Sequence, residues 1–246
     1  MFLRAGTCEY EEQEAKEVLA GYCFYTQPGH WRPPSEVYGD LPEQPHDARW
    51  AYRAFDCCPR DPEGAVTQLD LVAPVLLNVS QGYGTGLMSR LLSVTGELSS
   101  TLQKVDVKRN FWDLPEDHIS PAGIPPEGKD SWWLHRAWYL LESVDGAGRA
   151  ITNKILHFKR PNQFPLADSR TLPGVPDGIW LHPHRDLNRF RDAYEGLERW
   201  FEVLASKHSG VPLKRLRIHD ILLWTKLNEA DYTLARASGE QILNSG

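Results

Sequence analysis

Hydrophobic residues recur every three or four positions through much of the chain, which is the spacing of amphipathic helices. The longest such patterns predict helices at residues 131–143, 150–158, 186–207 and 212–227. Shorter helices are predicted at residues 9–19, 67–78, 87–92 and 97–105. Along the sequence of 246 residues, no alternation of hydrophobic and polar positions is long enough to predict a sheet. The pattern therefore predicts a mainly α protein that folds as a multi-helix bundle.

The first quarter of the chain lacks this regular spacing. Residues 27–46 are rich in proline, glycine and aromatic side chains, and the aromatic content is too high for a disordered tail. We expect residues 1–66 to form an irregular N-terminal region that packs on the body. Residues 67–232 are expected to form one helical domain, and residues 233–246 a frayed tail.

Two glycines separate a pair of the predicted helices. Gly146 and Gly148 flank a single alanine, and glycine adopts the positive φ angles that other residues disfavour. Pro161 ends the second helix, and residues 164–166, Phe-Pro-Leu, are extended because a residue before proline avoids the α region. Asp168 follows. The predicted order is helix, glycine turn, helix, extended link and carboxylate.

This order resembles the helix-hairpin-helix DNA glycosylase superfamily. The superfamily pattern runs roughly Leu-Pro-Gly-Val-Gly-Arg-Lys-Thr-Ala, then an apolar helix, then Phe-Pro-Val-Asp-Thr-His. Residues 146–149, Gly-Ala-Gly-Arg, match the hairpin, and residues 164–168, Phe-Pro-Leu-Ala-Asp, match the approach to the acid. The offset of 18 residues from Ala150 to Asp168 fits the superfamily's distance from its lysine position to its aspartate. The resemblance covers about 40 of the 246 residues and implies a helix-hairpin-helix motif within the bundle.

The departures from the superfamily pattern determine which reaction the resemblance implies. Ala150 occupies the position of the covalent lysine nucleophile, Asp145 replaces the proline before the first glycine, and the cluster-binding cysteines of some members are missing. The resemblance therefore implies a monofunctional N-glycosylase of DNA or of a nucleotide, acting by simple hydrolysis and without a cofactor. It implies Asp168 as the catalytic carboxylate, which stabilises the developing sugar cation or orients the attacking water.

The charge distribution favours an anion site only in the centre of the chain. A net charge of −6 argues against a strong nucleic-acid binder, whose affinity depends on neutralising phosphates. Residues 1–70 hold 13 acidic and 6 basic side chains, a net charge of −7, which leaves +1 for the remainder. Residues 145–170 hold five basic and two acidic side chains. This central segment can therefore face a phosphate although the whole protein is acidic.

Side chains and backbone around the glycine turn are the candidate nucleic-acid contacts. The candidate phosphate-binding residues are Gly146, Gly148, Arg149, Lys154, Lys159 and Arg160. Trp132 and Trp133, on the first helix, are candidates for stacking on a base, as in enzymes that handle single bases. Core packing is the alternative for two of the three tryptophans on this helix.

Other functions fit the same residues. Asp168 is also an ordinary helix N-cap candidate, and the glycine pair is also a plain interhelical turn. A non-catalytic helix-hairpin-helix nucleic-acid-binding module would keep the phosphate contacts alone. A protein-interaction domain is favoured by the acidic net charge and the aromatic content. His219 and Asp220 form a second possible acid–base pair, with buried hydrogen-bonding roles as the alternative.

A second resemblance covers more of the chain. Residues 70–79, 159–161 with Asp168-Ser169, and 216–224 are similar to a bacterial family of unknown function. The four cysteines form no Cys-x-x-Cys pair, and the sequence predicts no metal site. The longest hydrophobic run, near residues 69–79, is too short and too polar to cross a bilayer. We therefore expect a cytoplasmic protein with no membrane contact.

Overall fold

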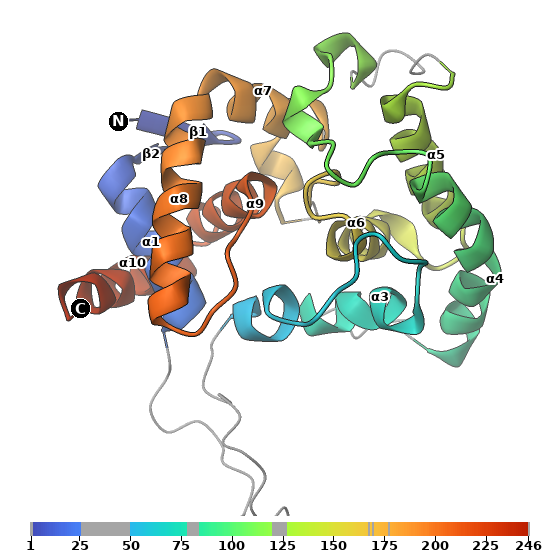
Figure 1. Ribbon diagram of the computed structural model, residues 1–246. Coiled ribbons are helices and arrows are strands. Elements are labelled where there is room, and N and C mark those ends of the chain that lie inside the picture. The colour runs from blue at the N-terminus through green and yellow to red at the C-terminus, as the bar shows by residue number, and fades with distance from the viewer. Residues whose placement is uncertain are drawn as a thin grey trace, which may run out of the picture.

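The computed structural model describes residues 2–25, 50–77, 84–119, 127–166, 168, 170–176 and 178–245. The described chain is mainly helical, and its one sheet is a two-stranded antiparallel hairpin (Figure 1). The strands and α-helices are β1 (Phe2–Ala5), β2 (Cys8–Glu11), α1 (Glu12–Phe24), α3 (Gln68–Val72), α4 (Thr85–Leu102), α5 (Asp130–Glu142), α6 (Gly148–Lys159), α7 (Leu181–Arg189), α8 (Arg191–Lys207), α9 (Arg215–Lys226) and α10 (Glu229–Asn244). The shorter helical turns are η1 (Tyr52–Asp56), η2 (Ala73–Leu77), η3 (Phe111–Asp113), η4 (Glu116–His118) and η5 (Leu172–Gly174).

The two ends of the chain pack together on one side of the molecule. Helix α1 lies along α10 and also contacts α8 and α9 (Figure 1). The two helices cross so closely that only glycine fits at position 21. A Cβ atom at Gly21 would lie 1.8 Å from the backbone oxygen of Ala235. The N-terminal hairpin is fastened to the same group, since the Tyr10 hydroxyl donates to the Leu222 carbonyl at 2.6 Å. Segments far apart in sequence therefore form one body.

The opposite side of the molecule is built from α3 to α6 (Figure 1). Helices α4 and α5 pack side by side, α5 contacts α6, and α6 contacts α3 and η2. The Thr67 hydroxyl and the Asp70 carboxylate cap α3 reciprocally. Pro74 falls where α3 gives way to the 3₁₀ turn η2, because proline cannot continue the α hydrogen bonding.

Helices α6 and α9 are the most deeply buried elements between these two sides. Residues 151–159 of α6 are all buried, and nine of the twelve residues of α9 are buried. Both helices carry charged side chains within their buried surface, namely Lys154, Lys159, Arg217 and Asp220. Buried charges require partners, and these partners connect α6 and α9 to the loops around them.

Several predicted elements differ from the structure. The chain from residue 233 was expected to be frayed, but α10 continues to Asn244 because α1 covers it. The N-terminal region was expected to be irregular apart from a helix at residues 9–19; that helix is α1, and the hairpin of β1 and β2 precedes it. The predicted helix at 186–207 is instead α7 and α8, separated at Phe190, and the helices at 87–92 and 97–105 form the single α4. The predicted aromatic loop at residues 27–46 lies outside the described residues.

Candidate functional site

The turn between α5 and α6 contains both predicted glycines in left-handed conformations. Gly146 has φ +86° and Gly148 has φ +57°, so both positions favour glycine. The Arg90 side chain of α4 fixes the turn by donating to the Asp145 carbonyl at 2.9 Å. Arg149 is exposed in the first turn of α6, where backbone N–H groups lack partners within the helix. Of the predicted phosphate contacts, the two glycines and Arg149 therefore lie together at this corner.

Two of the predicted phosphate ligands are buried away from the corner. Lys159 donates to the carbonyls of Asp61 and Ala65 at 2.6 and 2.7 Å, and its Nζ lies 3.5 Å from Asp70 Oδ2. Arg160 is also buried and donates to the Leu102 carbonyl at 3.2 Å. The sequence predicted both cations as phosphate ligands, a role that requires an accessible side chain. The structure instead surrounds the end of this helix with loops that supply carbonyl oxygens.

Asp168 lies at the edge of this buried region, with its side chain one-quarter exposed. Its Oδ1 accepts from the backbone N–H groups of Arg170 and Thr171 at 2.9 and 3.2 Å. The Thr171 hydroxyl in return accepts from the Asp168 N–H at 3.0 Å. These bonds fix the carboxylate at the start of the helical turn that leads into η5, which is the capping geometry the sequence left open as an alternative.

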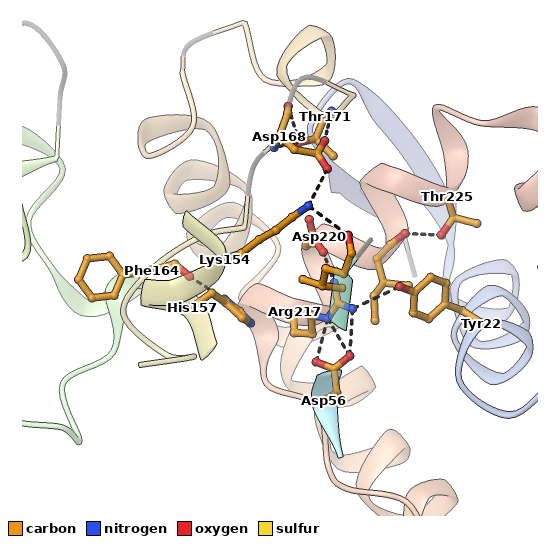
Figure 2. Close-up of polar contacts among 12 residues, drawn as sticks. Tyr22, Asp56, Lys154, His157, Phe164, Asp168, Thr171, Arg217, Asp220 and Thr225 are labelled. Carbon is orange, nitrogen blue, oxygen red and sulfur yellow. Dashed lines mark hydrogen bonds and ion pairs between the residues drawn. The ribbon is translucent and has the colours of Figure 1, made fainter. Parts of the chain in front are cut away.

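Lys154 brings α6 to Asp168. Its Nζ lies 3.7 Å from Asp168 Oδ2 and 3.4 Å from the Leu77 carbonyl, and its side chain is only 9% exposed (Figure 2). Burial lowers the pKa of Lys154, although the charges of Asp168 and Asp220 oppose that shift. The sequence predicted Lys154 as a phosphate ligand, but the structure pairs it with the candidate catalytic carboxylate. Both contacts are long, so the ammonium group is held loosely.

Arg217 of α9 forms a second charged group beside this pair. Its Nε and Nη2 each donate to Asp56 at 2.9 Å, its Nη2 also donates to the Tyr22 hydroxyl at 3.2 Å, and its Nη1 donates to Asp220 (Figure 2). Burial raises the pKa of Asp220 to about 7, although Arg217 opposes the shift. The nearby Asp168 carboxylate raises it further. The Arg217 group and the Lys154–Asp168 pair therefore interact electrostatically.

His157 contributes a neutral imidazole to the same region. Its Nδ1 donates to the Phe164 carbonyl at 2.7 Å, and its Nε2 is buried without a hydrogen-bond partner. Burial lowers the pKa of His157 to about 3. The ring therefore stays neutral and fixes the extended link before Asp168.

His219 and Asp220 do not act as the adjacent pair that the sequence suggested. His219 Nε2 lies 3.1 Å from Asp186 Oδ2, and the same oxygen accepts from the Gly6 N–H at 2.7 Å. Asp220 instead faces Arg217. Consecutive side chains on a helix diverge by about 100°, so the two groups enter different environments. His219 has the buried hydrogen-bonding role named as its alternative.

Trp132 and Trp133 are not brought to Asp168 by any contact of the described residues. They form an edge-to-face pair with ring centroids 4.5 Å apart, and they line a hollow between α4 and α5. Their stacking on a base stays a prediction. If it occurs, it occurs in the hollow between α4 and α5 and not beside Asp168.

No functional role for Asp56, Tyr22 or Arg217 was predicted from the sequence. One signal was present, because Arg217 and Asp220 interrupt a helix that is otherwise almost entirely apolar. Charged residues in such a helix are buried and need partners. The partners themselves could not be found from the sequence, since Tyr22 and Asp56 precede Arg217 by more than 150 positions.

A comparison with protein families shows where the chain belongs. A family of unknown function, DUF6308, matches residues 35–227, more than three quarters of the 246 residues. The chain belongs to this family, as the second resemblance predicted. No curated protein and no solved structure matches the chain. The helix-hairpin-helix glycosylase resemblance is not supported by a family match and stays a prediction.

No helix in the described ranges is long and apolar enough to cross a membrane. Within the same ranges, no three histidine, cysteine, aspartate or glutamate side chains lie together as a metal site would require.

Proposed function

We propose that this protein hydrolyses an N-glycosidic bond in DNA or in a nucleotide, with Asp168 as the catalytic carboxylate. One observation carries the proposal: Asp168 is partly exposed, fixed by two backbone N–H donors, and 3.7 Å from a buried lysine of the helix that follows the glycine turn. The two backbone donors hold the carboxylate in one orientation beside the lysine. A fixed anion at this position suits the positive charge that develops on the sugar.

The corner between α5 and α6 supports the substrate class. The positive φ angles of Gly146 and Gly148 between two helices, with Arg149 exposed beside them, support the proposed helix-hairpin-helix motif. The N-terminus of α6 presents unpaired backbone N–H groups and the positive end of the helix dipole. A phosphate bound there would place its nucleotide at the N-terminal end of α6, the helix that also carries Lys154.

The test is release of a free base from damaged duplex DNA, single-stranded DNA and free nucleotides. We expect Asp168→Asn to lower the single-turnover rate by at least ~100-fold, because the substitution removes the charge and keeps the shape. Asp192→Asn, an exposed aspartate on α8, is the matched control and should leave the rate unchanged. An unchanged rate for Asp168→Asn would remove this carboxylate from the mechanism.

Borohydride trapping distinguishes hydrolysis from a lysine-dependent reaction. Ala150 occupies the position of the superfamily's nucleophile, so we expect no covalent protein–DNA product after borohydride treatment. A trapped product that disappears in Lys154→Met would replace simple hydrolysis with an amine-dependent reaction.

The capping bonds of Asp168 favour a second candidate function. A carboxylate whose main contacts are the N–H groups of Arg170 and Thr171 also serves as a purely structural cap. In that case the corner binds phosphate without chemistry, as a helix-hairpin-helix binding module. Nucleic-acid binding that Arg149→Gln weakens, with no base release from any substrate, would support this alternative.

A further inference from the structure

The hollow between α4 and α5 has the composition of a ligand site. It measures about 370 Å³ and is lined from one side by Glu97, Ser100, Thr101 and Lys104, and from the other by Trp132, Trp133 and Arg136. Ligand sites have volumes of about 300 Å³ or more and combine aromatic surface with a few polar groups. Both tryptophans are only partly buried, so aromatic surface remains available within the hollow.

Cations border the aromatic surface. Lys104 Nζ lies 6.0 Å from the centroid of the Trp133 ring, and Arg136 pairs with Glu97 across the hollow at 2.7 Å. The lining therefore holds two cations and one carboxylate. A second hollow beside β2 and α1 contrasts with it, since it holds Arg236 and four carboxylates at Glu9, Glu11, Glu14 and Glu17. The hollow between α4 and α5 suits an aromatic ligand that carries negative charge, and the other repels one.

We propose that the hollow between α4 and α5 binds a base and the adjoining phosphate of single-stranded nucleic acid. A tryptophan face can stack only on a base whose own face is free, which excludes the paired bases of an intact duplex. Lys104 and Arg136 then contact the phosphate, and the tryptophan pair contacts the base. This assignment separates base stacking from the region of Asp168.

The position of the hollow along α5 supports this occupant. The tryptophans lie in the first turn of α5, and the glycine turn follows its last residue. The 13 residues of α5 span roughly 20 Å at the usual helical rise. A short strand can therefore reach from the corner to the hollow. Contact of one strand with both the corner and the hollow rests on the proposed function. Binding inferred from the residues that line the hollow does not.

The test is a fluorescence anisotropy titration of labelled oligothymidine with the full chain at low salt. We expect Trp132→Leu to bind roughly 10-fold more weakly, because leucine keeps an apolar side chain and removes the stacking ring. Lys104→Gln should also weaken binding and lower the slope of log affinity against log salt by about 1. Lys104 is exposed, so this second variant should fold normally.

Trp200→Leu is the matched control. Trp200 lies on α8, is partly buried, and has Lys16 Nζ 5.8 Å from its ring centroid, so it has the same local chemistry at another place. We expect this variant to bind as the wild type does. Equal affinity of the wild type, Trp132→Leu and Lys104→Gln would overturn the proposal. Failure of the wild type to bind oligothymidine at low salt would also overturn it.

The binding readout does not depend on base release. Trp132→Leu should weaken oligothymidine binding whether or not any base is released, since Asp168 does not line the hollow. Loss of the proposed hydrolysis in every preparation would therefore leave the expected binding results in place. Conversely, unaltered binding by Trp132→Leu would remove this subsite while the Asp168 assay still stands.

Discussion

The Arg217 group and the Lys154–Asp168 pair lie next to each other but hold their charges differently. Arg217 reaches Asp56, Asp220 and Tyr22 through hydrogen bonds of 3.2 Å or less and is almost completely buried. Lys154 lies 3.7 Å from Asp168, whose carboxylate is partly open to solvent. The Arg217 group is shielded from solvent, whereas the Lys154–Asp168 pair is partly accessible to it. We call the first the closed group and the second the open pair.

The difference separates stability from chemistry. A guanidinium whose donors are occupied holds α9 to η1 and α1, and it has little capacity left to meet a ligand. A loosely paired ammonium and a partly exposed carboxylate can change partners when a substrate arrives. We therefore expect substitutions in the Arg217 group to act mainly on folding, and substitutions at Lys154 and Asp168 to act mainly on the proposed reaction.

The largest effect is expected from Arg217→Met. The substitution leaves the buried Asp56 and Asp220 carboxylates without their cation, which should lower the free energy of unfolding by about 3–5 kcal/mol. Chemical denaturation measures this change. Arg136→Gln, which breaks the exposed pair with Glu97, is the control and should cost less than about 1 kcal/mol. Equal losses in the two variants would contradict the structural role of the closed group.

The next effect depends on pH. The pKa of Asp220 is raised to about 7 in the folded protein, whereas the unfolded value is about 3.9. The folded state therefore binds this proton more tightly, and the contribution to stability is present below pH 4 and is lost as pH rises towards 7. Between pH 4 and 7, the free energy of unfolding of Asp220→Asn should rise by about 3 kcal/mol relative to that of the wild type. Above the folded pKa, the difference between the two proteins should change little.

The pH experiment needs the difference between variant and wild type because another group acts in the opposite direction. The pKa of His157 is lowered to about 3, so its contribution to stability is lost as pH falls below about 6.5. Both proteins contain His157, and its effect cancels in the difference. A stability difference that does not change between pH 4 and 7 would show that Asp220 does not titrate there.

A smaller effect on folding is expected from Lys154→Met. The long contacts to Asp168 and Leu77 contribute little, and removing a buried ammonium relieves its desolvation, so the free energy of unfolding should change by no more than about 1 kcal/mol. The rate of base release should nevertheless fall, by about 10-fold, because Asp168 loses its cation. If Lys154→Met lowers the free energy of unfolding by several kcal/mol and keeps full activity, Lys154 has a structural role like that of Arg217.

The smallest effect is expected at the corner. Gly148→Ala places a side chain at φ +57° with no atom within 4 Å of the new Cβ, so only backbone strain of about 1 kcal/mol should appear. Gly96→Ala, within α4 and equally free of neighbours, should instead stabilise the protein by about 0.5–1 kcal/mol. Thermal denaturation compares the two variants. Opposite signs are expected, and equal signs would contradict a left-handed Gly148.

The two parts of the candidate site differ in how far the sequence could predict them. Both the turn at Gly146 and Gly148 and the extended link before Asp168 follow from local chemistry, because glycine and proline act on their own backbone. Lys154 and Lys159 were predicted to lie on a surface. Their burial follows from loops at residues 61–70 and at Leu77 that cover α6, and local spacing contains no information about those loops.

The sequence by itself determined helices α5, α6 and α9, the glycine turn, and the presence of a carboxylate 18 residues after Ala150, since each depends on short-range periodicity or backbone preference. Only the tertiary structure decided that α10 covers α1, that Arg217 reaches Asp56 and Tyr22, and that Lys154 meets Asp168. The physical reason is that a charge enters the core only where distant segments supply its partners. Those segments meet only when the whole chain has folded.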